Sequence, residues 1–140
     1  MFENIVFQTV ISGVLVFLIG ETIQRFILEP LKEYKMVIGK IDNKLKYYSK
    51  MLTSSNLPVN ALIEIMAVFR ELSCELESTY KQIPIRDIFT LFHIIEAHND
   101  ISEAAKGLIY LSNAGGKEKR EENNRLEIEK IRKNLRIANL

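Results

Sequence analysis

The histidines, the cysteine and a group of carboxylates are the side chains of this sequence that could carry chemistry. His93 and His98 are five residues apart, so on one helix they point about 140° apart and cannot easily share a metal ion. Cys74 is the only cysteine, which excludes an intramolecular disulfide, and we expect it to be a small packing residue rather than a reactive thiol. Carboxylates spaced as on an ordinary exposed helix face are Glu64, Glu71, Glu75 and Glu77.

No catalytic motif accompanies these residues. The sequence contains neither His-Glu-x-x-His nor Gly-x-Ser-x-Gly, and it lacks the phosphate-binding patterns Gly-x-x-x-x-Gly-Lys-[Ser/Thr] and Gly-x-Gly-x-x-Gly. The formal net charge of +1 argues against a protein whose surface is built to bind nucleic acid. The lysine-rich region of the chain has only Tyr47 and Tyr48 as interleaved aromatic residues. We therefore expect that the protein is not an enzyme. We also expect that it binds no cofactor, metal, small-molecule substrate or nucleic acid.

The N-terminal segment has the composition of a membrane helix. The run from Asn4 to Gly20 has no ionisable side chain, and as a helix it spans about 25 Å of a hydrocarbon core about 30 Å thick. Glu21 and Arg25 are one helical turn apart and can pair near the headgroups, and residues 26–28 are again apolar. We expect a single transmembrane anchor helix in residues 1–29.

Three other interpretations of this segment stay open. A cleaved secretory signal is disfavoured because no Lys or Arg precedes the apolar run and no Ala-x-Ala-like site follows Gly20. A buried helix of a soluble core is disfavoured because a small helical domain rarely surrounds one helix on every side. A helix lying flat in the interface needs a polar face, which only Gln8, Thr9 and Ser12 offer.

The flanking cations orient the anchor. They all follow the apolar run, which predicts that the N-terminus faces outside and that residues 30–140 lie in the cytoplasm, at the inner membrane. A lone reduced cysteine agrees with that compartment. The cations predicted to bind the membrane surface are Arg25, Lys32, Lys35, Lys40, Lys44, Lys46 and Lys50. The residues predicted to form transmembrane helix contacts are Gln8, Thr9, Ser12, Gly13 and Gly20.

Residues 30–140 predict an all-α fold, a bundle of about five helices. Pro30 is expected to break or kink the emerging helix at Glu29. The helix that follows has an apolar stripe at steps of three and four, formed by Tyr34, Val37, Ile38, Ile41, Leu45, Tyr48 and Leu52. We favour packing of this stripe into the domain core, with its lysines solvated, over a helix lying along the inner leaflet.

The second cytoplasmic helix is predicted from Val59 to Gln82. Its stripe consists of Leu62, Ile65, Met66, Phe69, Leu72, Leu76 and Tyr80. Pro84 starts a shorter helix whose density of Ile and Phe predicts the most buried cytoplasmic helix or an oligomer contact.

Two further helices are predicted towards the C-terminus. Asp100-x-x-Glu103 has the form of a capping box that opens the first of them, in which the small residues Ala104 and Gly107 predict close helix packing. Residues 113–124 predict a flexible charged loop, and the last helix is expected from about residue 123 to residue 138.

Several short pieces spread along the chain form a recognisable pattern. They are Gly20, Phe26 and Pro30; Val37 to Ile41; Tyr47-Tyr48; Arg70-Glu71-Leu72-x-x-x-Leu76; Ile83-Pro84; Ala104 to Asn113 except Tyr110; and Ile131-Arg132-Lys133-x-Leu135-Arg136-Ile137. In these pieces the sequence resembles an uncharacterised family of small bacterial single-pass membrane proteins with a helical cytoplasmic domain. The resemblance spans most of the chain but contains no catalytic motif, so it implies an architecture and no activity.

Two functions are compatible with this organisation. The first is a non-enzymatic membrane-anchored interaction or scaffold module that acts as a homo-oligomer or with a protein partner. The second is an oligomeric membrane-perturbing effector or small channel, as in bacterial anti-phage defence, with Gln8, Thr9 and Ser12 lining a contact or pore and Glu21 at its mouth.

Overall fold

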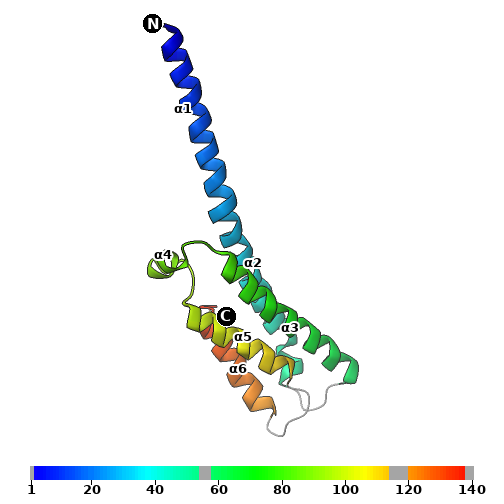
Figure 1. Ribbon diagram of the computed structural model, residues 1–140. Helices are drawn as coiled ribbons and strands as arrows, with labels where there is room; N and C mark the ends of the chain where they lie inside the picture. The colour runs from blue at the N-terminus through cyan, green and yellow to red at the C-terminus, as the bar shows by residue number, and fades with distance from the viewer. Residues whose placement is uncertain (1, 54–57, 114–119, 138–140) are drawn as a thin grey trace.

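The computed structural model describes residues 2–53, 58–113 and 120–137, and in these residues it contains helices and turns but no strand (Figure 1). The predicted all-α fold is confirmed. In chain order the elements are α1 (Phe2–Ile23), the π-helical segment η1 (Gln24–Leu28), α2 (Glu29–Leu52), α3 (Val59–Gln82), α4 (Arg86–Leu91), α5 (His98–Ser112) and α6 (Arg120–Asn134).

Of the predicted break or kink at Pro30, the break is absent, and the chain has instead a local distortion just before Glu29, the π-helical segment η1. A proline has no N–H to donate, and inside an α-helix its ring clashes with the carbonyl four residues earlier. The chain accommodates both effects by widening the preceding turn, where the Glu29 N–H donates to the Gln24 carbonyl five residues back. Helical structure therefore continues from Phe2 to Leu52, over about 75 Å at 1.5 Å per residue.

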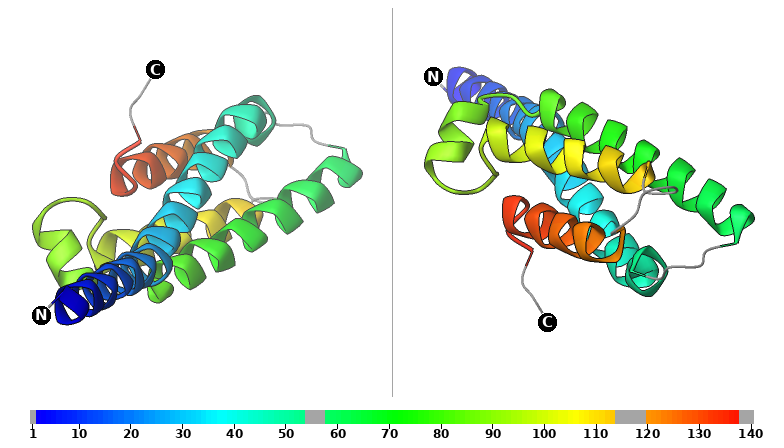
Figure 2. Two further views of the ribbon diagram at one scale, coloured as in Figure 1. Left: turned by 90° about the horizontal axis from the view of Figure 1, so that it is seen from above. Right: turned by 90° about the horizontal axis from the view of Figure 1, so that it is seen from below.

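Four of the helices form a bundle around the second half of this long helix. In sequence order α2 packs on α3, α3 on α5 and α5 on α6, and α6 closes the ring by packing on α2. Successive members run in opposite directions, so α3 returns towards the end of the bundle from which α1 emerges (Figure 1). Figure 1 shows α1 projecting alone from the bundle, and Figure 2 shows the bundle helices from above and below.

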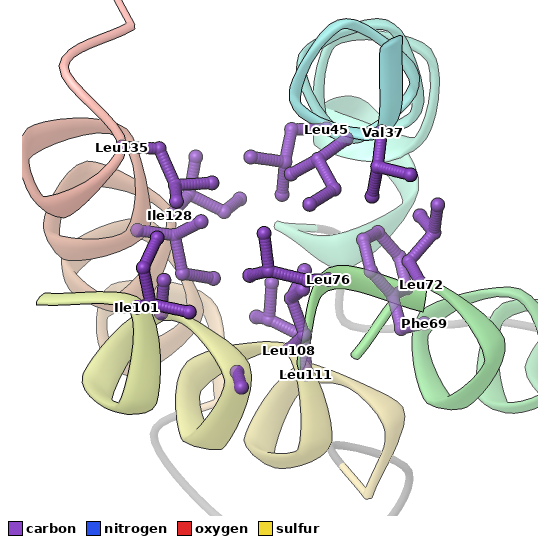
Figure 3. Packing of buried hydrophobic residues seen from close by; sticks show 14 of the residues in the cluster. Val37, Leu45, Phe69, Leu72, Leu76, Ile101, Leu108, Leu111, Ile128 and Leu135 are labelled. Atoms are coloured by element: carbon purple, nitrogen blue, oxygen red, sulfur yellow. The ribbon is translucent and has the colours of Figure 1, made fainter. Parts of the chain in front are cut away.

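The bundle core is built from the stripes that periodicity predicts. Side chains from all four helices point into one shared interior, as Figure 3 shows for Leu45, Leu76, Leu108 and Ile128. On α2 the predicted stripe is buried except for the half-buried Ile38, which confirms core packing of that helix. The α3 stripe is buried as well, with Leu62 and Met66 half-buried at its edge, so α3 matches its predicted bounds and orientation.

Three local predictions in the C-terminal half are wrong. Asp100 does not cap α5, because the helix already begins at His98 and Asp100 lies inside the first turn, where its negative charge favours the helix dipole. The last helix begins at Arg120 rather than at residue 123 and ends at Asn134 rather than at residue 138. Residues 120–124 of the predicted loop are therefore helical, while residues 114–119 lie outside the described residues.

A buried polar contact joins α6 to the end of α2. Asn124 is buried, and its side-chain amide donates to the Leu52 carbonyl at 2.7 Å. That carbonyl is one of the last four of α2, which have no partner within their own helix. Asn124 of α6 thus supplies a hydrogen-bond donor to the last carbonyl of α2.

The Ile- and Phe-rich segment after Pro84 is not the most buried helix. It forms only the six-residue helix α4, which has no buried residue in this chain. Leu91 and Phe92 are 74% and 69% exposed, while Phe89 packs partly against the core. Figure 1 shows α4 standing off from the bundle near the junction of α1 and α2.

Candidate functional site

The outer surface of α1 is the most unusual surface of the molecule. Every side chain from Asn4 to Gly20 is exposed, including large apolar ones such as Phe7, Val16 and Phe17. The helix that includes α1 has an 18-residue window with a mean hydropathy of 1.9 and 0% buried, so it is long and apolar enough to span a membrane. Because none of this window is buried, the soluble-core interpretation does not describe α1 in a single chain.

The predicted transmembrane contact residues all lie on this uncovered helix. Gly13 and Gly20 have open space where a Cβ would point, and Gln8 and Ser12 are exposed. The Thr9 hydroxyl donates to the Ile5 carbonyl one turn earlier, at 2.8 Å, so it is satisfied within its own helix. All five of these residues are therefore exposed in the single chain.

The predicted Glu21–Arg25 pair is present, with 2.7 Å between Arg25 Nη2 and Glu21 Oε1. It lies where the uninterrupted apolar run ends. Both side chains are partly or largely exposed, so the pair contributes little stability in water, and its main effect is to neutralise two charges beside the apolar surface.

The cations predicted to bind the membrane do not lie on one common surface. They follow α2 away from α1, and Lys50 lies 25 residues, about 37 Å along the helix, beyond Arg25. Several of them are paired: Lys40 with Glu75 at 3.1 Å and Lys46 with Asp42 at 2.8 Å. If α1 crosses a bilayer, only the first three cations, Arg25, Lys32 and Lys35, stay near its surface, and Lys44 to Lys50 are solvated bundle residues.

A buried polar cluster ties α2 to the segment that follows α4. The Tyr34 hydroxyl donates to the Glu96 carboxylate, and both side chains are almost completely buried. Lys35 Nζ lies 3.7 Å from the same carboxylate. Burial and the hydrogen bond to an anionic acceptor raise the pKa of Tyr34 above its usual value, so its hydroxyl stays protonated. This cluster fixes the segment to α2 next to the point where α1 joins the bundle.

A second tyrosine–carboxylate contact lies towards the far end of α2. The Tyr48 hydroxyl donates to Glu64 Oε1 at 2.5 Å, across the α2–α3 interface. The hydrogen bond to this carboxylate, followed by burial, raises the pKa of Tyr48 to about 12. Both tyrosines therefore join α2 to another part of the bundle, Tyr34 to the segment after α4 and Tyr48 to α3.

The remaining candidate chemical residues are dispersed. His93 lies in the turn after α4, whereas His98 is the first residue of α5, so the expectation that the two histidines share one helix is wrong. The His98 ring stacks on the Tyr80 ring, with 5.9 Å between the ring centroids. No group of three His, Cys, Asp or Glu side chains that could hold a metal ion occurs in the described ranges. Cys74 is exposed, so the expectation that it packs in the interior is wrong.

The small residues of α5 do lie at a helix crossing. Ala104 is fully buried, and a Cβ on Gly107 would lie 2.7 Å from both Glu127 Oε1 and Ile131 Cγ1 of α6. At a neighbouring crossing, the Ser73 hydroxyl donates to the Ala105 carbonyl at 3.0 Å, which links α3 to α5. These contacts stabilise the bundle and form no ligand site.

Sequence reasoning missed the partners of the polar residues that join the elements. Glu96 and Asn124 have no periodic or motif signal, because their acceptors and donors lie 62 and 72 residues away in the chain. The exposure of the α4 segment was also missed, because a high density of apolar residues indicates burial without indicating what covers them. Comparisons of this chain with protein-family models, curated proteins and solved structures found no match.

Proposed function

We propose that this chain is a non-enzymatic membrane-anchored interaction module of the bacterial inner membrane, which acts as a homo-oligomer or on a protein partner. The observation that carries the proposal is the uninterrupted helix from Phe2 to Leu52. Its first part exposes apolar side chains on all faces, and its last part supplies the buried stripe of α2. One helix therefore serves both as the anchor and as a core element of the bundle.

Lipid is the cover that fits α1 best. Between Ile5 and Gly20 its exposed surface is apolar except at Gln8, Thr9 and Ser12, whereas a helix that docks on a protein or lies flat in the interface keeps a broad polar side. A helix also satisfies its own backbone hydrogen bonds, as a hydrocarbon environment requires. Retention of the segment is supported by the continuity of α1 with a bundle helix, which a cleaved leader would not need.

Tethering is the mechanism that this arrangement supports. An anchor confines the bundle to two dimensions and raises its effective concentration towards partners in the same membrane. Because α1 continues directly into α2, the bundle is also held at a fixed distance and orientation. Gln8 and Ser12 lie one turn apart on α1, and polar side chains in lipid favour contact with another helix, which supports a homo-oligomer.

The same two polar residues support a second candidate, an oligomeric membrane-perturbing effector or small channel. In an assembly of α1 helices, Gln8 and Ser12 would face either a dry helix contact or a wet pore. The two candidates differ in their effect on the membrane potential.

The native cysteine offers a test of anchoring and orientation. Cys74 is the only cysteine of the chain and is exposed on α3. In bacterial spheroplasts, a membrane-impermeant maleimide should leave Cys74 unlabelled until the cells are lysed. The matched variant, Asn4→Cys in a Cys74→Ser background, should be labelled in intact spheroplasts.

Two results would contradict the proposal. Labelling of Cys74 but not of Asn4→Cys in intact spheroplasts would reverse the orientation. Recovery of the untagged chain in the supernatant after ultracentrifugation, without detergent, would overturn the anchor itself.

A further inference from the structure

The α4 segment presents a dense cluster of large apolar side chains to the solvent. The members of this α4 patch are 40–74% exposed, and they are Ile85, Ile88, Leu91, Phe92 and Ile94. Ile88, Leu91 and Phe92 are spaced by three and four residues, so they share one side of the short helix, while Arg86 lies on the opposite side. Elsewhere on the described bundle the exposed large apolar residues are less dense, such as Val59 and Ile63 one turn apart on α3 and Leu126 on α6.

The patch lies at the end of the bundle that faces the anchor. Figures 1 and 2 place α4 beside the junction of α1 and α2, at the end of the bundle opposite to the last turn of α2. The buried Glu96, just after the patch, contacts Tyr34 of α2. Tyr34 follows Leu28, an exposed apolar residue of the long helix, by six residues, which is about 9 Å along the axis.

Most backbone N–H groups of the α4 segment are hydrogen-bonded within the segment. The N–H groups of Ile88, Phe89, Phe92, His93, Ile94 and Ile95 all donate to carbonyls within residues 85–90. Main-chain groups that are satisfied in this way can enter the lipid interface without losing hydrogen bonds. Ile85 and His93, which flank α4, both have a left-handed backbone, with φ of 52° and 56°. Such a conformation is unfavourable for a β-branched residue, and it turns the chain sharply at each end of the excursion.

We propose that the α4 patch inserts into the interfacial region of the membrane and forms a second lipid contact beside α1. This inference rests on the anchoring proposed above. A six-residue helix has too little apolar surface to bind a bilayer from solution, but here the anchor holds the patch beside the surface, so a weak affinity suffices. The occupant is lipid rather than a second copy because α4 lies at the end of the bundle from which α1 emerges (Figure 1), and an α1 that spans a bilayer holds this end next to the lipid surface.

Insertion also explains the apolar residues beyond the charged pair. Ile5 to Leu28 is about 36 Å of helix, longer than a hydrocarbon core of about 30 Å, and a helix accommodates such an excess by tilting. A tilt towards the side that carries α4 brings Phe26, Leu28 and the α4 patch to the same membrane surface. The bundle is then held by two contacts, which fixes its rotation about the anchor.

Depth-dependent fluorescence quenching of the full chain in vesicles tests this inference. Single cysteines in a Cys74→Ser background carry an environment-sensitive fluorophore, and the vesicles contain phosphatidylglycerol, phosphatidylcholine and a lipid spin-labelled near the headgroup. The probed variant is Leu91→Cys, with Phe92→Cys as a second position if Leu91→Cys does not fold. The controls are Val59→Cys at the far end of the bundle and Leu15→Cys in the anchor.

The expected result is a blue shift and strong quenching at Leu91→Cys and no quenching at Val59→Cys. A spin label deep in the acyl chain should quench Leu15→Cys. Quenching at Leu15→Cys without quenching at Leu91→Cys overturns the α4 contact and leaves the anchor intact. Absence of quenching at both positions overturns the anchor as well. Spontaneous disulfide formation between copies of Leu91→Cys, without quenching by lipid, would instead assign the patch to a second copy.

Discussion

The absence of a side chain at Gly107 allows α5 and α6 to pack closely where they cross. A Cβ at this position would lie 2.7 Å from Ile131 Cγ1, and the side chain of a buried Ile131 cannot move away freely. We expect Gly107→Ala to lower the free energy of unfolding by about 1–3 kcal/mol through overpacking, which outweighs the gain of about 1 kcal/mol in helix propensity. Chemical denaturation of the detergent-solubilised chain measures the change.

Gly39 provides the matched control. It also lies inside a helix, but a Cβ there would meet nothing within 4 Å. Gly39→Ala should therefore raise the free energy of unfolding by up to about 1 kcal/mol. Destabilisation by both substitutions, to the same extent, would contradict the close α5–α6 crossing.

Tyr48 gives the fold a measurable dependence on alkaline pH. Its hydrogen bond to the Glu64 carboxylate, together with burial, raises its pKa from the usual 10 to about 12 in the folded chain. Between these values the folded chain retains a proton that the unfolded chain has released, so the free energy of unfolding falls as the pH rises through this window. Below pH 10 the full contribution is present.

Thermal unfolding between pH 9 and pH 12 measures this effect. Tyr48→Phe should lower Tm at pH 9 and should show a shallower loss of Tm at higher pH. Tyr47→Phe changes the neighbouring exposed ring and should follow the pH dependence of the parent chain. Equal slopes for Tyr48→Phe and the parent would show that the Tyr48–Glu64 contact does not control this titration.

At the scale of elements, the spacing of apolar residues predicts which side of a helix is buried in the bundle core. The stripes of α2 and α3 were predicted almost residue by residue, because a helix that packs on one side must bury residues at steps of three and four. The helix bounds of α3 were predicted as well. The close packing at Gly107 has a signal in the sequence too, since small residues in a helix allow a second backbone to approach.

Two elements were predicted incorrectly because their local sequence is compatible with more than one structure. Proline breaks a helix in most contexts, and only the wider turn at Gln24–Leu28 lets the helix pass Pro30. The α4 segment has the composition of a core helix, but the bundle is already closed by α2, α3, α5 and α6. Glu96 and Asn124 could not be predicted because their hydrogen bonds join distant parts of the chain.

The continuity of α1 with α2 predicts a defined distance across the membrane boundary. Leu15 and Asn43 are both exposed and 28 residues apart, which is about 42 Å of continuous helix. Spin labels at Leu15→Cys and Asn43→Cys, in a Cys74→Ser background, should give a narrow distance distribution by double electron–electron resonance. Insertion of three glycines after Leu28 should broaden it, because glycine is a poor helix former.

A short or broad distribution in the parent chain would mean that the helix is interrupted at Pro30. The anchor and the bundle would then be joined by a flexible hinge. Anchoring could still hold in that case, but the fixed orientation of the bundle could not.

At the scale of the whole molecule, the two proposed functions use the same helix in different environments. For a tether, α1 needs only lipid and a dry contact with another copy. For a channel, the assembled helices must enclose water, and Gln8 and Ser12 would supply the polar lining while Glu21 would form a ring of acidic side chains at the mouth. In the single chain Glu21 pairs with Arg25, which removes the net charge that such a ring needs. This pairing favours the tether.

Induced expression in bacteria, with a potential-sensitive dye as the readout, separates these two functions. We expect the membrane potential to stay unchanged on induction of the parent chain, and we expect Gln8→Leu to weaken cross-linking between copies, because it removes a polar side chain that favours helix contact in lipid. Leu15→Ile is the control, since it changes an exposed side chain of α1 without changing its polarity. A collapse of the potential that disappears in Gln8→Leu or Glu21→Ala, at equal membrane content, would replace the tether by a pore.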